Sequence, residues 1–209
     1  MSAKKQGQKT EAVSAFQRLE RMHPHKTFLF FAIVGSALAF LSLIFLYAIR
    51  IADVKITADF HFPKIFMVST VLLLMSSYTL SRCARAFRND EMIDLRVSLF
   101  ITVMLATTFC VTQILGCKEL YDAGIFINGQ PGVAFLYLIS GLHFVHVLGG
   151  IFALSYLNFN TYVASNDLVK QLLYFSSKRE KNKIELVSIF WHFVDFVWVF
   201  LFFMFLFSL

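Results

Sequence analysis

Four polar side chains in the last hydrophobic stretch, residues 185–209, have types and spacing that could support chemistry. They are separated by three, four and three residues: Glu185, Ser188, His192 and Asp195. In a helix this spacing places them along one face, which we call the polar seam. A carboxylate and an imidazole at membrane depth could relay protons or bind a substrate, or they could pair to hold helices together.

The stretch that carries the polar seam is long enough to cross a bilayer, which takes about 20 helical residues. An ionisable side chain at the bilayer centre costs about 2.5–3.5 kcal/mol on insertion scales, so we expect the seam to face protein rather than lipid. For Asp195, a structural pairing, a retained proton and a proton-relay role all stay open. Glu185 is predicted to cap the helix start, where the helix dipole favours an anion. A second stripe, formed by Trp191 and Trp198, runs beside the seam.

Two further histidines lie in the stretch S-G-L-H-F-V-H-V-L-G-G, residues 140–150. His143 and His146 are three residues apart and share a helix face, and the glycines around them allow a neighbouring helix to come close. With His192 they could hold a haem or a metal; alternatively they bond to backbone or partner-helix groups, or meet lipid head groups. Because three separated imidazoles are a sparse ligand set, we expect this chain to bind no cofactor and no metal. We expect the polar seam to lie opposite the His143/His146 face.

The composition is that of an integral membrane protein. The 209 residues are 58% hydrophobic and only 15% charged, whereas about a quarter of the residues in a soluble domain are charged. The net charge of +6 is typical of basic cytoplasmic loops, and we expect no nucleic-acid partner. The three cysteines form no C-x-x-C pair and are interpreted as free, small apolar residues.

The hydrophobic runs predict an all-α bundle of five transmembrane helices. Residues 1–26 form a polar, lysine-rich arm, and residues 27–209 form the membrane domain. The spans are predicted at residues 27–49, 65–84, 97–117, 133–157 and 186–208. Residues 158–183, before the last span, are predicted to be a polar connector.

The lysines and arginines predict an orientation. Fifteen of the nineteen lie in the N-terminal arm, around the loop after the second span or in the connector, and four lie on the other side. Basic residues concentrate in cytoplasmic loops, so the N-terminus is predicted to be cytoplasmic and the C-terminus to lie outside. Three of the fifteen end the second span at three-residue spacing: Arg82, Arg85 and Arg88. They could bind anionic lipid head groups or act only as a topology signal.

Three motifs, in chain order, resemble subunit III of haem-copper respiratory oxidases. The final-helix motif is W-H-F-V-D-x-x-W at residues 191–198, with Glu185 six residues before it. Residues 141–147 resemble the family's histidine helix, and Gln113 with K-E-L at 118–120 resembles the end of the helix before that. The resemblance covers most of the chain and fits the short, five-helix bacterial form.

This resemblance implies a non-redox subunit of a proton-pumping terminal oxidase in the bacterial inner membrane, with a periplasmic C-terminus. Such a subunit packs on subunit I, which carries haem and copper. It also contacts other oxidase subunits and phospholipid, and it supports proton uptake and the lifetime of the complex. Cytochrome c is the first choice of electron donor and quinol the second. Membership of a larger respiratory supercomplex stays open.

The sequence departs from the family pattern in two respects, and the family properties that depend on them are not expected of this protein on the resemblance alone. Longer family members have seven spans and bind lipid in a cleft that the first pair of spans helps to make, so lipid sites in the five-span form stay open. Many members carry a membrane carboxylate where this chain has Ala37, and no role of that carboxylate is carried over. The rival interpretations are an accessory protein of a nitric oxide reductase, a haem-binding cytochrome, and a small proton-coupled transporter, although no inverted repeat typical of transporters is evident.

Overall fold

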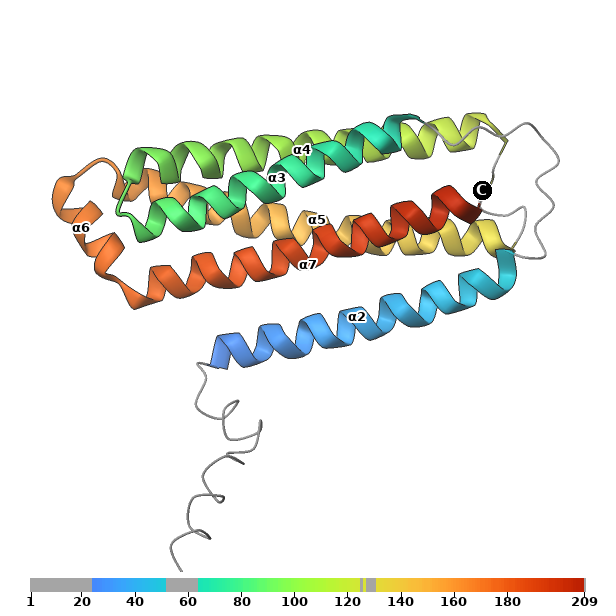
Figure 1. Cartoon of the computed structure of the whole chain (residues 1–209), viewed down its shortest axis with the longest axis horizontal. Coiled ribbons are helices and arrows are strands. Elements are labelled where there is room, and N and C mark those ends of the chain that lie inside the picture. The colour runs from blue at the N-terminus through green and yellow to red at the C-terminus, as the bar shows by residue number, and fades with distance from the viewer. Residues whose placement is uncertain (1–23, 52–63, 125, 127–130, 209) are drawn as a thin grey trace, which may run out of the picture. The chain divides into compact units, whose positions relative to one another are not determined.

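The computed structural model describes residues 24–51, 64–124, 126 and 131–208. The helices, labelled in Figure 1, are α2 (Pro24–Ile51), α3 (Lys64–Arg88), α4 (Met92–Asp122), α5 (Pro131–Ala164), α6 (Leu168–Ser176) and α7 (Lys178–Ser208). These residues contain no strand, which confirms the all-α class for the described chain. All the helices except the nine-residue α6 are long and apolar enough to cross a membrane, which confirms five candidate spans. The orientation of the termini stays a prediction.

Backbone contacts divide the chain into two compact units, residues 1–38 and 39–209. The described part of the first unit is the first half of α2, and none of its described side chains is buried. Most of the predicted N-terminal arm, up to residue 23, lies outside the described residues. The second unit holds the rest of α2, which contributes Phe40 and Tyr47 to the buried core, together with helices α3 to α7.

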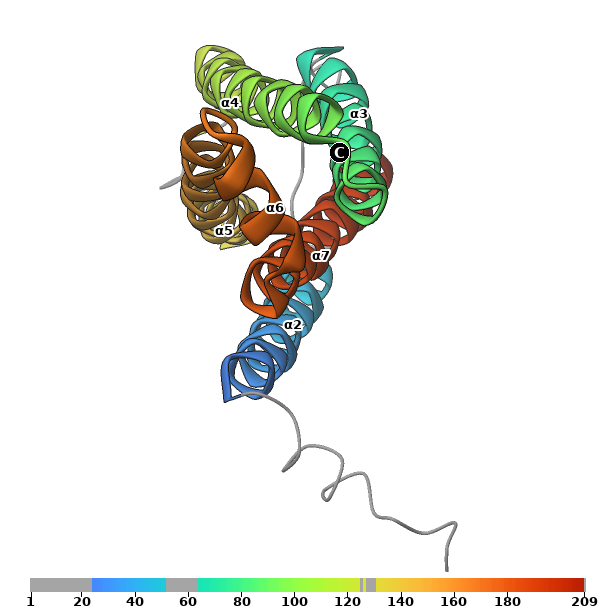
Figure 2. The ribbon, with the colours of Figure 1, turned by 90° about the vertical axis from the view of Figure 1, so that its left-hand side faces the viewer.

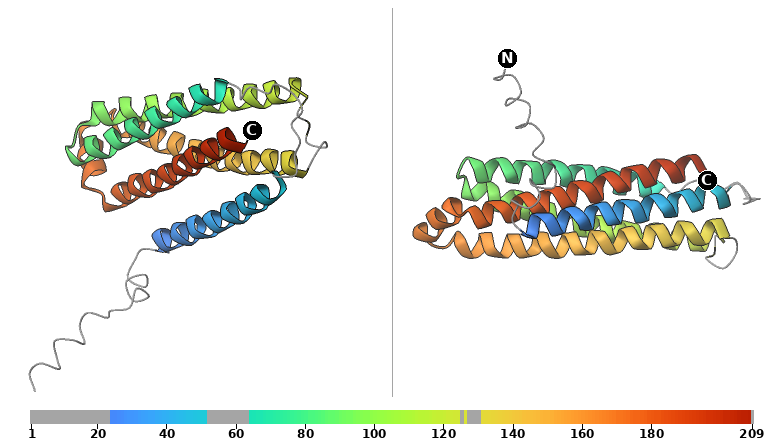
Figure 3. Two further views of the ribbon diagram at one scale, coloured as in Figure 1. Left: turned by 45° about the vertical axis from the view of Figure 1, so that its right-hand side comes forward. Right: turned by 90° about the horizontal axis from the view of Figure 1, so that it is seen from below.

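Four helices of the second unit form a ring. Helix α3 contacts α4 and α7, and α5 contacts the same two helices. Figure 2 shows these helices close to end-on around a common centre, and Figure 3 shows them running alongside one another. Each has fully buried side chains, for example Leu73, Phe109, Leu154 and Trp191. Most of the buried core of this unit therefore comes from these four helices, and Phe40 and Tyr47 of α2 and Tyr174 of α6 join it.

Helices α3 and α4 are joined by a tight turn at Asp90, whose φ of 59° lies in the left-handed region. The Glu91 N–H donates to the Ala86 carbonyl over 3.0 Å, and the Asn89 N–H donates to the Arg85 carbonyl over 3.1 Å. The first of these bonds, together with the left-handed residue, is the Schellman arrangement that ends many helices. Because the turn is so short, α3 and α4 pack as an antiparallel pair.

The residues predicted as a polar connector, 158–183, are largely helical. Helix α5 continues to Ala164, α6 begins after Asp167, and α7 begins at Lys178. The Asp167 carboxylate accepts a hydrogen bond from the Val169 N–H over 3.0 Å and so caps α6. The prediction stopped each span at its last apolar residue, but a helix can continue where its charged side chains reach water.

Helix α6 is anchored by Tyr174, whose hydroxyl lies 3.0 Å from Thr161 Oγ1 of α5. Its ring also packs edge-on against Phe87 at the end of α3, with centroids 5.9 Å apart. Burial raises the pKa of Tyr174 to about 12, so its hydroxyl keeps its proton. These contacts place the α3–α4 turn and the α5–α6–α7 connections at the same end of the unit.

The predicted capping role of Glu185 is wrong. Because α7 begins at Lys178, Glu185 lies in its second turn, away from the free N–H groups of the helix start. The acidic residue in the first turn is Glu180, whose Oε1 forms an ion pair with Lys183 Nζ at 2.7 Å.

Gly150 allows α5 and α7 to approach closely. A Cβ atom at this position would lie 2.7 Å from Cε3 and from Cζ3 of the Trp191 ring, closer than such atoms can pack. At Gly149, the next residue, a Cβ would meet nothing within 4 Å. The two glycines therefore form a matched pair, one with a packing role and one without.

We expect Gly150→Ala to lower the free energy of unfolding by about 1–3 kcal/mol, because the added methyl forces the buried Trp191 ring to move. Gly149→Ala should leave stability unchanged or raise it slightly, since alanine favours the helix. Thermal unfolding of both variants in the same detergent measures the difference. Equal melting temperatures for the two variants would contradict the close packing of α5 on α7.

Candidate functional site

The polar interior of the ring is organised by five residues of α3, which we call the hydroxyl row: Ser69, Thr70, Ser76, Ser77 and Thr79. Most of these hydroxyls donate to a carbonyl of their own helix; for example, Ser76 Oγ donates to the Leu73 carbonyl over 2.7 Å and Thr70 Oγ1 to the Phe66 carbonyl over 2.8 Å. A hydroxyl that has donated its hydrogen still has lone pairs with which it can accept. The row therefore suits neighbours that carry N–H donors.

Helix α7 supplies two such donors from its tryptophan stripe. Trp191 Nε1 donates to Ser76 Oγ and Trp198 Nε1 donates to Thr70 Oγ1, each over 3.1 Å. Both indole rings are almost fully buried, and an indole N–H can only donate. The two bonds therefore fix the register of α7 against α3.

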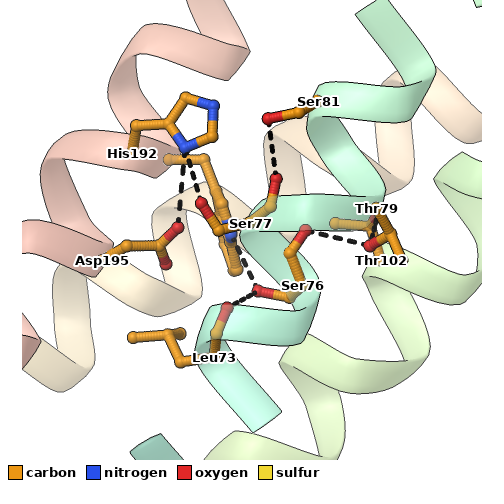
Figure 4. Close-up of polar contacts among 9 residues, drawn as sticks. Leu73, Ser76, Ser77, Thr79, Ser81, Thr102, His192 and Asp195 are labelled. Carbon is orange, nitrogen blue, oxygen red and sulfur yellow. Dashed lines mark hydrogen bonds and ion pairs between the residues drawn. The ribbon is translucent and has the colours of Figure 1, made fainter. Parts of the chain in front are cut away.

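Helix α4 pairs with the hydroxyl row from the other side. Gln113 Nε2 donates to Ser69 Oγ over 2.9 Å, and Thr79 Oγ1 lies 2.8 Å from Thr102 Oγ1. All of these side chains except Thr79 are buried. Figure 4 shows the Thr79–Thr102 contact on one side of α3 and the α7 contacts on the other.

The polar seam of α7 meets α3 at Ser77, as Figure 4 shows. His192 Nδ1 lies 2.8 Å from Ser77 Oγ and 3.8 Å from Asp195 Oδ2. The Asp195 side chain is only 7% exposed, whereas that of His192 is 43% exposed. Within the described residues, neither carboxylate oxygen of Asp195 makes a hydrogen bond. Glu185 and Ser188 are half-buried nearer the start of α7.

The His143/His146 face meets the tryptophan stripe instead of the polar seam, which corrects the expected arrangement. The His143 ring stacks on Trp198 with centroids 5.2 Å apart and an angle of 30° between the ring planes. Phe109 adds an edge contact at 6.3 Å, and His143 is 1% exposed. Neither ring nitrogen of His143 has a hydrogen-bond partner among the described residues. His146 Nδ1 lies 2.8 Å from the Leu142 carbonyl of its own helix.

These positions separate the three membrane histidines into different environments. His143 packs among aromatic rings, while His192 lies at the α3–α7 boundary. In the part of the chain that the structure describes, no three His, Cys, Asp or Glu side chains gather as metal ligands could. The chemical feature that this region offers is the Ser77–His192–Asp195 chain, in which His192 Nδ1 contacts Ser77 Oγ at hydrogen-bond distance and lies 3.8 Å from the Asp195 carboxylate, within range of an ion pair but not of a hydrogen bond.

The hydroxyl row was not predicted from the sequence. A signal was present: Ser76 and Thr70 are six residues apart, close to the seven that separate Trp191 and Trp198. Using that signal requires knowing that α3 and α7 are neighbours. Three arginines for which the sequence left a lipid contact and a topology signal open are exposed in the last two turns of α3: Arg82, Arg85 and Arg88. Both roles stay open.

The sequence matches the family described as cytochrome c oxidase subunit III over residues 26–208. A probable cytochrome c oxidase subunit 3 of Nocardia farcinica is 30% identical over 139 residues, which cover 66% of this chain and 64% of the relative. A cytochrome c oxidase subunit 3 of Schizophyllum commune is 29% identical over 136 residues, 65% of this chain and 46% of the relative. A probable quinol oxidase subunit 3 of Staphylococcus saprophyticus is 25% identical over 148 residues, 71% of this chain and 69% of the relative. The chain thus spans less than two thirds of the first two relatives.

The Trp191–Ser76 bond can be measured with a double-mutant cycle of Trp191→Phe and Ser76→Ala. Ser76→Ala should lower the free energy of unfolding by about 1–3 kcal/mol, because it leaves a buried indole N–H without an acceptor. The two effects should be less than additive, with a coupling near the 0.6 kcal/mol average for hydrogen bonds between membrane helices. The same cycle with Ser81→Ala, a hydroxyl that bonds to its own helix at Ser77, is the control and should show no coupling.

Proposed function

Because the chain belongs to the cytochrome c oxidase subunit III family, we propose that it is the non-redox third subunit of a proton-pumping haem-copper terminal oxidase. Oxygen reduction takes place on partner subunits that hold the haem and copper, and this chain binds no redox cofactor of its own. The scattered positions of His143 and His192 support that assignment. Cytochrome c is the proposed donor, and the resemblance to a quinol oxidase subunit supports quinol as the second candidate.

The observation that carries the proposal is the exposure of His192. Its side chain is half-exposed near the middle of α7 and lies beside the buried Asp195. The surrounding surface is apolar, with Tyr78, Ile189 and Phe196 all exposed. An ionisable group facing lipid at this depth is costly, and such groups usually face protein or a water-filled cavity. We therefore assign this face of α3 and α7 to the contact with subunit I, with other oxidase subunits and lipid covering the remaining surface.

The Ser77–His192–Asp195 chain has a supporting role in this proposal. Its half-exposed His192 imidazole gives the docking face a polar group that a partner helix can bond. The protein as a whole therefore supports proton uptake and the working lifetime of the complex, and it takes no part in the chemistry of oxygen reduction. Its proposed location is the bacterial inner membrane, with the N-terminus cytoplasmic.

Purification of the affinity-tagged full chain in mild detergent tests the proposal. It should co-purify with subunits that carry haem and copper and that consume oxygen with reduced cytochrome c or quinol. Dissociation of this chain should remove no haem absorbance from the remaining complex. Recovery of a nitric oxide reductase, or of the chain with a haem spectrum of its own, would contradict the assignment.

Asp195→Asn separates a structural role from proton transfer, because it removes the charge but keeps the shape. We expect normal assembly and normal initial turnover, with a shorter working lifetime at most. Asp94→Asn, the same change at an exposed residue in the first turn of α4, is the matched control. Loss of initial turnover in a normally assembled Asp195→Asn complex would show that Asp195 takes part directly in proton transfer.

A further inference from the structure

A polar pocket of about 450 Å³ lies where the end of α5, the helix α6 and the start of α7 meet. Three cations line it, Lys170 from α6 with Arg179 and Lys183 from α7, and they face a single carboxylate, that of Glu180. Three positive charges against one negative charge leave an excess of two. No residue of α3 lines the pocket, so it is separate from the His192 face that is assigned above to subunit I.

Two of the three cations in this pocket have no counter-ion. Lys183 Nζ pairs with Glu180 Oε1 at 2.7 Å and lies 5.3 Å from the centre of the Tyr156 ring. Lys170 and Arg179 are exposed and form no ion pair with any residue that the structure describes. Glu180 Oε2 is buried and accepts no hydrogen bond from the described residues. The pocket therefore offers two cations and one buried acceptor to a ligand.

An apolar surface adjoins the pocket on the outer side of α6. We call it the α6 face, and its residues are Leu168, Val169, Leu172 and Leu173, each between 63% and 77% exposed. The pairs 168/172 and 169/173 are four residues apart, which places all four side chains on one side of the helix. Leu173 also lines the pocket, so the apolar face and the charged pocket are continuous. An exposed apolar patch beside polar groups is typical of an interaction site.

The position of α6 favours a protein over lipid as the molecule that covers this surface. Figures 1 and 2 show α6 crossing the end of the helix ring rather than running along its side. Helices α5 and α7 have 34 and 31 residues, whereas about 20 suffice to cross the hydrocarbon core. At this end of α7 the additional residues are charged, five of the six at positions 178–183. Lipid tails lie alongside the spans, so a surface beyond the ends of the spans suits a protein partner.

We propose that this end surface binds an acidic, amphipathic segment of a partner protein. Carboxylates of the segment pair with Lys170 and Arg179, and its apolar side chains cover the α6 face. A backbone N–H of the segment supplies the donor that Glu180 Oε2 lacks. Charge selects this occupant, because a basic segment is repelled and a purely apolar one leaves both cations unpaired.

The test is a photo-crosslinking residue at Leu172 of the tagged full chain, activated in native membranes, with the cross-linked peptide sequenced by mass spectrometry. The adduct should be a protein segment that carries acidic and apolar side chains next to the cross-linked residue. Lys170→Glu combined with Arg179→Glu should lower the cross-linking yield about tenfold, because both attractions become repulsions. Exchanging the acidic residues of the captured segment for lysine should restore the yield in that variant.

The matched control combines Lys178→Glu with Lys181→Glu, the same charge reversal at two exposed residues that do not line the pocket. It should leave the yield unchanged. Both double variants should melt like the unmodified chain, since all four side chains are exposed. A lipid-mass adduct, a captured segment without acidic residues, equal losses in the two double variants, or no rescue by the lysine exchange would overturn the proposal. None of these readouts depends on oxidase activity or on the contact with subunit I.

Discussion

The structure depends on two indole N–H groups that are buried at membrane depth and must be bonded there. Trp191 and Trp198 donate to Ser76 and Thr70 of α3, and an unpaired donor in the same place would cost about 1–3 kcal/mol. The same two rings also contact α5, Trp191 across Gly150 and Trp198 by stacking on His143. Two side chains of α7 therefore hold three helices in register. Apolar contacts alone could not do this, because lipid tails are as apolar as the side chains of a neighbouring helix.

The orientation of α7 that satisfies the indoles also decides where the polar seam lies. The seam runs beside the tryptophan stripe on the same helix, so turning the tryptophans inward moves His192 to the flank of α3. This is why His192 bonds Ser77 rather than facing His143. The buried imidazole of His143 then serves as an aromatic packing surface, and the half-exposed imidazole of His192 is the one that a neighbouring molecule can reach.

Hydrophobicity alone predicted the all-α class and the five long helices, because a run of about 20 apolar residues has few alternatives to a membrane helix. The ends of the helices were not predicted from hydrophobicity. Helix α7 starts as early as Lys178, and α6 forms, because charged and polar residues can continue a helix at the membrane boundary. The hydroxyl row could not be recognised from one helix. A serine such as Ser76 satisfies its own backbone in isolation, and its second bond exists only because Trp191 of another helix lies opposite.

Most of the polar side chains inside the bundle are paired with one another, and a few polar side chains lie on outer faces where another molecule can contact them. The hydroxyl row, Gln113 and the indoles are paired with one another inside the ring, so a substrate or cofactor there would first have to break bonds that set the helix register. The half-exposed His192, which contacts Ser77, lies on an outer face of α3 and α7. Two buried exceptions among the described residues are the Asp195 carboxylate and the His143 imidazole, whose polar atoms make no hydrogen bond. With so few interior polar groups left unpaired, we expect this protein to act mainly through what covers its outer faces.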